Sequence, residues 1–263
     1  MEHLYAVIMA GGGGTRLWPL SRRSRPKQMM AISGDKTLFQ IAVERLNGIL
    51  NPDQIYIVTV EEQAKELSRQ KPEIPWKNFL LEPMPRGTAS VVALAAQAIQ
   101  LRDPEAVMVV LTADHFIKNV PHFHHLIKCG KKVANDGYLV TMGIEPQYPA
   151  TGYGYIQRGD RLDEFDGLPY YRVLKFKEKP NEDLAREFME RGDHDWNSGM
   201  FFWRVDRILE EISTHMPELF KIIDLIQKAW LTDRRQEVLL ENWPKIVPET
   251  IDYGIMEKAS RVA

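Results

Sequence analysis

The stretch "LYAVIMAGGGG" (residues 4–14) determines the expected fold. Its first seven residues are apolar without a break, and the run stops at four glycines. A continuous apolar run of this kind suits a strand that is buried on both faces, as in a parallel sheet. Glycine permits a tight turn and a close approach of a ligand to the backbone. The stretch therefore predicts a central strand that leads into a glycine loop.

Further strands and helices alternate with this one over about the first 145 residues. Apolar runs predict strands at residues 54–60, 79–83, 106–115 and 138–144. Helical patterns separate them at residues 37–50, from 61 onward, at 88–101 and at 123–136. This alternation is typical of a doubly wound α/β fold with a parallel sheet. Ligands bind such sheets at the carboxyl ends of the strands, where the glycine loop and "TADH" (112–115) should lie.

The second half of the chain has a different pattern. Predicted strands at residues 151–159, 170–180 and 197–205 are separated by helical patterns at 181–192 and 207–230. No Gly/Ser linker, low-complexity tract or internal repeat divides the halves. We expect one domain over residues 1–263. Residues 1–145 form its nucleotide-binding half, and residues 146–263 elaborate the same sheet and cover the ligand edge.

Composition narrows the class of protein. Apolar residues make up 44% of the 263, which provides for a core, and the formal net charge of −2 argues against a nucleic-acid-binding protein. Cys129 is the only cysteine, which excludes an internal disulfide or a multi-cysteine zinc site and favours the reducing cytoplasm. No signal peptide begins the sequence, and no apolar run approaches the ~20 residues of a membrane helix.

Positive charge gathers directly after the glycines. Between Glu2 and Asp35 there is no acidic residue, while five cationic residues occur: Arg16, Arg22, Arg23, Arg25 and Lys27. Cations without carboxylates repel one another unless they are solvated or paired with an anion, which a triphosphate would supply. Glycine turns at helix N-termini offer free N–H groups to phosphate. A merely tight strand–helix turn remains the alternative, and the three middle arginines are assigned to a solvated surface.

Two common phosphate loops do not match. Walker A requires Lys and then Ser or Thr after its last glycine, but here Thr15 and Arg16 follow Gly14. The third glycine of a dinucleotide fingerprint would fall at Leu17. The loop is therefore expected to bind phosphate in another way, with Arg16 and Lys27 as its cations.

The stretch "AGGGGTRLWPLSRRSRPKQ" (10–28) resembles the G-G-x-G-T-R-L-x-P-L-…-P-K signature of sugar-nucleotide pyrophosphorylases. Its ending "PKQ" resembles the bacterial mannose-1-phosphate guanylyltransferases. Six further segments resemble motifs of the same family in the same order: "EPMPRGTASVVALAA" (82–96), "LTADH" (111–115), "TGYGYI" (151–156), "FKEKP" (176–180), "WNSGMF" (196–201) and "IDYGIMEKA" (251–259).

The resemblance implies a Rossmann-like nucleotidyltransferase domain with a mainly parallel mixed sheet. It implies transfer of GMP from GTP to mannose 1-phosphate, giving GDP-mannose and pyrophosphate. On the nucleotide side, Arg16 would face the leaving pyrophosphate, Lys27 the α-phosphate, and Asp114 would hold Mg²⁺. A helix N-cap is the alternative role of Asp114. The backbone amides expected at the phosphates belong to Gly11, Gly12, Gly14 and Thr15.

The resemblance also assigns the base and the sugar. Glu82 would accept both N–H donors of the guanine edge, and Gly87, Thr88 and Ala89 would supply backbone contacts near the base. Gly87 stands where the family usually has Asn, so one contact of that side chain is missing. The residues implied around the mannose phosphate are Gly154, Glu178, Lys179, Asn197 and Gly199. For Gly199, simple packing is an equal alternative.

The sequence stops before the family's D-x-G-x-W segment, whose Asp is the second carboxylate on the metal. A further C-terminal domain that helps in dimer formation also commonly follows. A truncated chain and a natural short homologue that binds nucleotide but catalyses poorly are the two explanations, and truncation is favoured. We expect this chain to bind GTP yet to need a second carboxylate for Mg²⁺. The other expected partners are mannose 1-phosphate and, through a homodimer, a second copy of the chain. A pyrophosphorylase for another hexose 1-phosphate remains an alternative.

Overall fold

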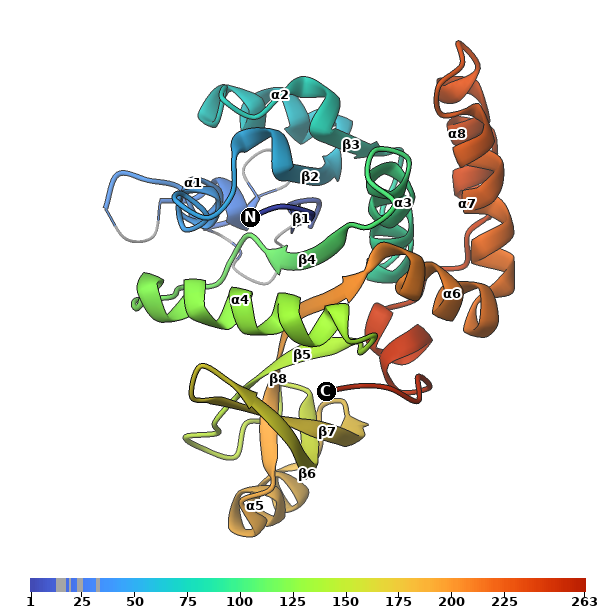
Figure 1. Cartoon of the computed structure of the whole chain (residues 1–263). Coiled ribbons are helices and arrows are strands. Elements are labelled where there is room, and N and C mark those ends of the chain that lie inside the picture. Colours follow the sequence, from blue (N-terminus) through green and yellow to red (C-terminus); the bar gives the residue numbers. More distant parts are fainter. Residues whose placement is uncertain (13–17, 19, 23–25, 32–33) are drawn as a thin grey trace.

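The computed structural model describes residues 1–12, 18, 20–22, 26–31 and 34–263. Within these residues one mixed sheet has the order β3-β2-β1-β4-β8-β6-β7, and β5 pairs with β8 (Figure 1). Its strands are β1 (Leu4–Met9), β2 (Ile55–Val60), β3 (Phe79–Glu82), β4 (Val107–Thr112), β5 (Val140–Ile144), β6 (Tyr155–Phe165), β7 (Leu168–Lys177) and β8 (His194–Arg204). The α-helices are α1 (Leu38–Glu44), α2 (Glu61–Gln70), α3 (Thr88–Gln100), α4 (Val120–Asn135), α5 (Glu182–Arg191), α6 (Val205–His215), α7 (Pro217–Ala229) and α8 (Arg235–Asn242).

The apolar run of β1 divides its side chains between two cores. Tyr5 and Val7 lie in a core that also contains buried residues of α3, α6 and α7. Leu4, Ala6 and Ile8 lie in a second core with residues of α1 and α4. Because successive side chains of a strand point to opposite faces, a strand covered by helices on both faces must be apolar throughout. The predicted doubly wound fold is confirmed.

The sheet changes direction at β8. Strands β3, β2, β1 and β4 are parallel, whereas β8 is antiparallel to β4, β5 and β6, and β6 is antiparallel to β7. The predicted mixed sheet is confirmed, but its parallel part is limited to those four strands. We expected residues 138–144 to extend the parallel series. They run in the expected direction, because β4 and β5 are both antiparallel to β8. They do not pair with β4, because residues 201–204 of β8 occupy its free edge.

The second half of the chain builds onto the same sheet, as predicted. The β6–β7 hairpin and α5 lie at the far end from β3 (Figure 1). The last residues of the chain run between β5 and β7. There the Leu139 amide donates to the Arg261 carbonyl at 2.9 Å, and the Val173 amide donates to the Val262 carbonyl at 2.9 Å. The division into halves at residue 145 stays a prediction.

Helix α3 is the most deeply buried helix of the first half. All its residues from Ala89 to Ile99 are buried, which confirms the interpretation of the alanine-rich stretch as a core helix. Even so, across the residues that the structure describes, no helix combines the length and the apolar character needed to span a bilayer.

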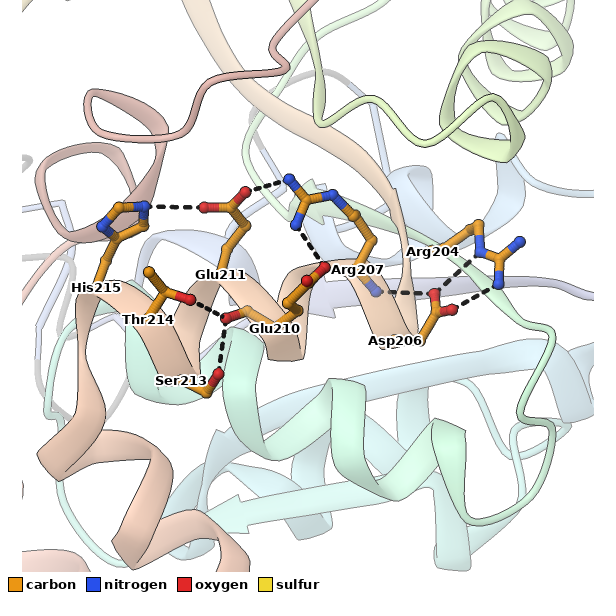
Figure 2. Close-up of polar contacts among 8 residues, drawn as sticks. All are labelled: Arg204, Asp206, Arg207, Glu210, Glu211, Ser213, Thr214 and His215. Atoms are coloured by element: carbon orange, nitrogen blue, oxygen red, sulfur yellow. Dashed lines mark hydrogen bonds and ion pairs between the residues drawn. The ribbon is translucent and has the colours of Figure 1, made fainter.

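The polar face of α6 carries a local network of charges (Figure 2). Asp206, in the first turn, accepts from the guanidinium of Arg204 at the end of β8. Glu211 is only 5% exposed, and it pairs with Arg207 one turn before it and with His215 one turn after it, at 3.0 Å for His215. Burying a carboxylate is costly unless it is paired. The network therefore stabilises α6 where it follows directly from β8.

Candidate active site

Four neighbouring strands bring the predicted nucleotide residues to one edge of the sheet. β1 lies between β2 and β4, and β3 lies on the other side of β2. The strands are parallel, so their carboxyl ends meet at the same edge. Gly11 follows β1, Asp114 follows β4, and Glu82 is the last residue of β3. This is the edge where the sequence predicted the glycine loop and Asp114 to lie.

Lys27 and Asp114 form an ion pair at this edge. Lys27 Nζ lies 3.0 Å from Asp114 Oδ2, and the side chains are 36% and 39% exposed. Burial acts to raise the pKa of Asp114, but hydrogen bonds from Lys27 and Thr112 outweigh it, and the pKa is lowered. The carboxylate is therefore ionised at neutral pH. It is not a helix N-cap, because Asn119 caps α4 by accepting from the His122 amide.

A buried arginine supports the turn that carries Asp114. Arg45 is 5% exposed, and its guanidinium donates to the His115 carbonyl at 2.8 Å. Burial lowers the pKa of Arg45, while the nearby Asp114 raises it. Arg45 Nε is buried with no hydrogen-bond partner among the described residues. Sequence analysis did not find this residue, because an arginine in a helical pattern gives no sign of its burial.

Glu82 is a buried carboxyl with an open acceptor. The residue is 4% exposed, and among the described atoms its Oε2 has no hydrogen-bond partner. Burial raises the pKa of Glu82 to about 7, although a backbone hydrogen bond from Arg86 acts to lower it. A Cβ at Gly11 would stand 2.5 Å from Glu82 Oε1. The glycine thus allows the carboxyl group to lie directly against the start of the phosphate loop.

Gln28 holds the described part of the glycine loop in place. Its Nε2 lies 2.7 Å from the Ala10 carbonyl, 3.2 Å from the Gly12 carbonyl and 2.7 Å from Gln63 Oε1 on α2. Both glutamines are buried. Gln28 belongs to the "PKQ" ending noted in the sequence, but sequence analysis assigned its side chain no role. Of the loop residues predicted at the phosphates, Gly14, Thr15 and Arg16 lie outside the described residues.

The predicted base segment packs against a segment far along the chain. Gly87 has a φ of +84°, and a Cβ there would collide with the Glu249 carbonyl. The Ala89 amide donates to the same carbonyl at 3.2 Å, and Thr88 Oγ1 accepts from the Ile251 amide at 2.9 Å. The amide of Ala89 is therefore engaged within the protein, and a base contact from it would require that bond to open. The backbone contacts predicted for these residues stay predictions.

The predicted sugar residues lie together at β8. The backbone N–H of Asn197 donates to the Gly154 carbonyl at 2.8 Å, and the backbone N–H of Gly199 donates to Asn197 Oδ1 at 3.0 Å. A Cβ at Gly154 would stand 2.5 Å from Glu178 Oε2. Glu178 also pairs with Lys179. The five residues thus form one polar group, and Gly199 takes part in it through its amide.

Asp252 belongs to this sugar group, although sequence analysis assigned it no role. Its Oδ1 accepts from Asn197 Nδ2 at 2.6 Å. Burial raises the pKa of Asp252, the hydrogen bond from Asn197 lowers it, and the nearby Glu178 raises it. The only available signal was its place in "IDYGIMEKA", since it lies 55 residues from its partner.

A metal would find one suitable carboxylate at the nucleotide edge. Within the described ranges, no group of three or more His, Cys, Asp or Glu side chains is placed to hold a metal ion. Asp114 alone is ionised and partly exposed there. Mg²⁺ commonly binds through one or two carboxylates together with substrate phosphates and water. Asp114 therefore fits the expected Mg²⁺ as one protein ligand, with substrate phosphates and water as the others.

Comparisons with known proteins identify relatives of this chain. The nucleotidyl transferase family matches residues 5–243. A mannose-1-phosphate guanylyltransferase of Salmonella montevideo is 40% identical over 97% of this chain and 54% of its own length. The solved structure of a Thermus thermophilus protein described as mannose-1-phosphate geranyltransferase has a TM-score of 0.86 and 33% identity, over 99% of this chain and 72% of that one. A Helicobacter pylori structure described as mannose-6-phosphate isomerase has a TM-score of 0.77 and 25% identity, over 99% and 95%.

The chain spans about half the length of the curated relatives it matches. The family match nevertheless covers nearly all of the sheet and, apart from Asp252, both groups of polar residues. By this match, the protein belongs to the nucleotidyl transferase family.

Proposed function

We propose that the protein transfers GMP from GTP to mannose 1-phosphate, giving GDP-mannose and pyrophosphate. The observation that carries the proposal is the meeting of Glu82, Gly11, Lys27 and Asp114 at one edge of the sheet. This edge offers a carboxyl for a base, a glycine backbone for phosphates, a cation, and a carboxylate for a metal. Several curated relatives are named mannose-1-phosphate guanylyltransferases, which supports the choice of GTP and of mannose.

Glu82 suits guanine among the bases. Guanine presents two adjacent N–H donors on its N1/N2 edge, and a carboxylate accepts both, whereas uracil and thymine lack that pair. The open Oε2 of Glu82 is the acceptor that a base would use. A buried acceptor left without a donor costs free energy, so a ligand that supplies two donors is favoured over one that supplies fewer.

The chemistry needs positioning and charge neutralisation rather than a base. A phosphate oxygen of mannose 1-phosphate attacks the α-phosphorus of GTP in line; the P–O bond to the β-phosphate breaks, and pyrophosphate leaves. The attacking oxygen is already ionised, so no proton has to be removed. Lys27 would neutralise charge at the α-phosphate, and Lys179 would hold the phosphate of the sugar. Mg²⁺ held by Asp114 would supply further positive charge to the phosphates.

Pyrophosphate release tests this proposal. The assay contains GTP, Mg²⁺ and mannose 1-phosphate, with the other nucleoside triphosphates and glucose 1-phosphate as comparisons. Release only with GTP and mannose 1-phosphate supports it. Lys27→Ala should lower kcat by about 100-fold or more, as expected for loss of a charge that stabilises the transition state. Lys36→Ala is the matched control, because Lys36 pairs with Glu44 on α1 instead.

Either of two results would contradict the proposal. One is equal release with any nucleoside triphosphate, which would leave Glu82 without a role in base choice. The other is unchanged activity of Lys27→Ala in a chain that remains folded. GTP binding without any release would instead agree with the expectation that this chain needs a second carboxylate for Mg²⁺.

A further inference from the structure

One short segment touches both groups of the candidate site. We call residues 249–252 the bridging segment. The Glu249 carbonyl accepts from the Ala89 amide at 3.2 Å, and the Ile251 amide donates to Thr88 Oγ1 at 2.9 Å, both at the base segment. The next residue, Asp252, accepts from Asn197 in the sugar group. The last residue of the bridging segment thus contacts Asn197, whose side chain is predicted to contact the hexose.

The carboxamide of Asn197 is held in one orientation. Its Oδ1 accepts from the Gly199 amide at 3.0 Å and from Thr141 Oγ1 at 3.2 Å, while its Nδ2 donates to Asp252 Oδ1 at 2.6 Å. A reversed carboxamide would place its NH₂ against the Gly199 N–H and its oxygen against the Asp252 carboxylate. An NH₂ group has two hydrogens, so one N–H of Asn197 remains for a ligand.

Gly154 allows the carboxylate of Glu178 to lie beside the side chain of Asn197. Gly154, whose carbonyl accepts from the Asn197 amide, would bring a Cβ to 3.6 Å from Asn197 Cβ and 2.5 Å from Glu178 Oε2. Because no Cβ is present, the carboxylate of Glu178 and the carboxamide of Asn197 border the same space. Asp252 begins a π-helical turn (Asp252–Met256), a wide turn that often occurs at functional sites.

We propose that Asp252 is a positioning residue for the hexose. It holds the Asn197 carboxamide so that the remaining N–H faces the space beside Gly154 and Glu178, where a sugar hydroxyl accepts it. Asp252 itself acts through Asn197 and does not touch the reacting phosphates. This inference rests on the proposed function, and it adds a residue that determines how the sugar is bound.

Three variants separate the hydrogen bond from charge. Asp252→Ala removes the acceptor, and Asp252→Asn keeps an oxygen at the same position. Glu257→Gln removes a negative charge that faces Asp252 and Glu178 but has no hydrogen bond to Asn197. Among the described residues, the other charged groups beside Asp252 are Glu178 and Lys179, which all three variants retain. Thermal unfolding of each variant establishes that the chain is folded.

Calorimetric titration with mannose 1-phosphate and with GTP provides the first readout. We expect Asp252→Ala to weaken mannose 1-phosphate binding by about 10-fold to 100-fold, the range for a hydrogen bond to a charged group. GTP binding should change by less than about threefold, and Asp252→Asn should recover most of the loss. Equal weakening of both ligands, or a Glu257→Gln loss as large as that of Asp252→Ala, would overturn the inference.

The side-chain amide of Asn197 provides a second readout without any ligand. Its ¹⁵N–¹H signals, assigned by their loss in Asn197→Ser, should shift strongly in Asp252→Ala and little in Glu257→Gln. Unshifted signals in Asp252→Ala would overturn the inference even if mannose 1-phosphate binding fell. Shifted signals in a protein that binds GTP but no hexose phosphate would instead refute the proposed sugar substrate and leave the positioning by Asp252 standing.

Discussion

Replacing Glu82 by glutamine should stabilise the fold and weaken GTP binding at the same time. The pKa of Glu82 is raised by burial from 4.5 to about 7. Between these values the folded chain binds more protons than the unfolded chain, so stability falls as the pH rises through this window and stays lower above it. Each tenfold change in proton affinity corresponds to 1.36 kcal/mol, so the full loss of unfolding free energy is about 3 kcal/mol. Glutamine has no such ionisation.

The assay is urea unfolding of the wild-type chain and of Glu82→Gln at pH 5 and pH 8.5. Most of the pH window from 4.5 to about 7 lies above pH 5. The unfolding free energy of Glu82→Gln relative to wild type should therefore increase by about 2.5 kcal/mol from pH 5 to pH 8.5. Glu190→Gln on the exposed face of α5 is the control, and its difference from wild type should not change with pH. GTP binding by the wild type should strengthen from pH 6 to pH 8, because the ionised carboxyl is the acceptor.

A stability difference that stays constant from pH 5 to pH 8.5 would refute the reasoning. It would mean that Glu82 is solvated or paired in the folded chain and titrates as in the unfolded chain. Equal GTP binding by wild type and Glu82→Gln would separately remove Glu82 from base recognition.

Three further predictions concern the same edge of the sheet and its support. Gln28→Ala should destabilise the fold by about 1–3 kcal/mol, because it leaves a buried oxygen of Gln63 without its donor, and should raise the KM for GTP; urea unfolding and steady-state kinetics measure both. Gly87→Ala should cost about 2–4 kcal/mol of unfolding free energy, since it adds a steric collision to a positive φ. Asp114→Asn should reduce Mg²⁺-dependent pyrophosphate release by about 100-fold, yet change stability by less than about 1 kcal/mol, as for an exposed ion pair.

Each of these has a matched comparison. Gln147→Ala, at an exposed position, should change neither stability nor KM. Gly192 has a φ of +68° with open space around it, so Gly192→Ala measures backbone strain without a collision; an equal loss in both glycine variants would contradict the collision. If Asp114→Asn keeps full activity at low Mg²⁺, the carboxylate does not hold the metal.

Local sequence was sufficient for the centre of the fold and for several site residues. The apolar run of β1 and its glycines predicted the central strand, because a strand buried on both faces cannot carry polar side chains. The glycine loop and Asp114 follow predicted parallel strands, so their shared edge followed from strand direction. The ion pair of Lys27 with Asp114 spans 87 residues, and its geometry came only from the structure.

The sequence by itself determined the doubly wound half of the protein, the edge where the candidate site lies, and some of the types of group found there. Tertiary structure decided the pairing of β5 with β8 instead of β4, the burial of Arg45, the place of Gln28 beneath the glycine loop, and the partnership of Asp252 with Asn197. These depend on contacts between distant residues, and the pattern around each residue does not encode its partner. Periodicity reports which face of an element is buried, whereas only folding of the whole chain determines which two faces meet.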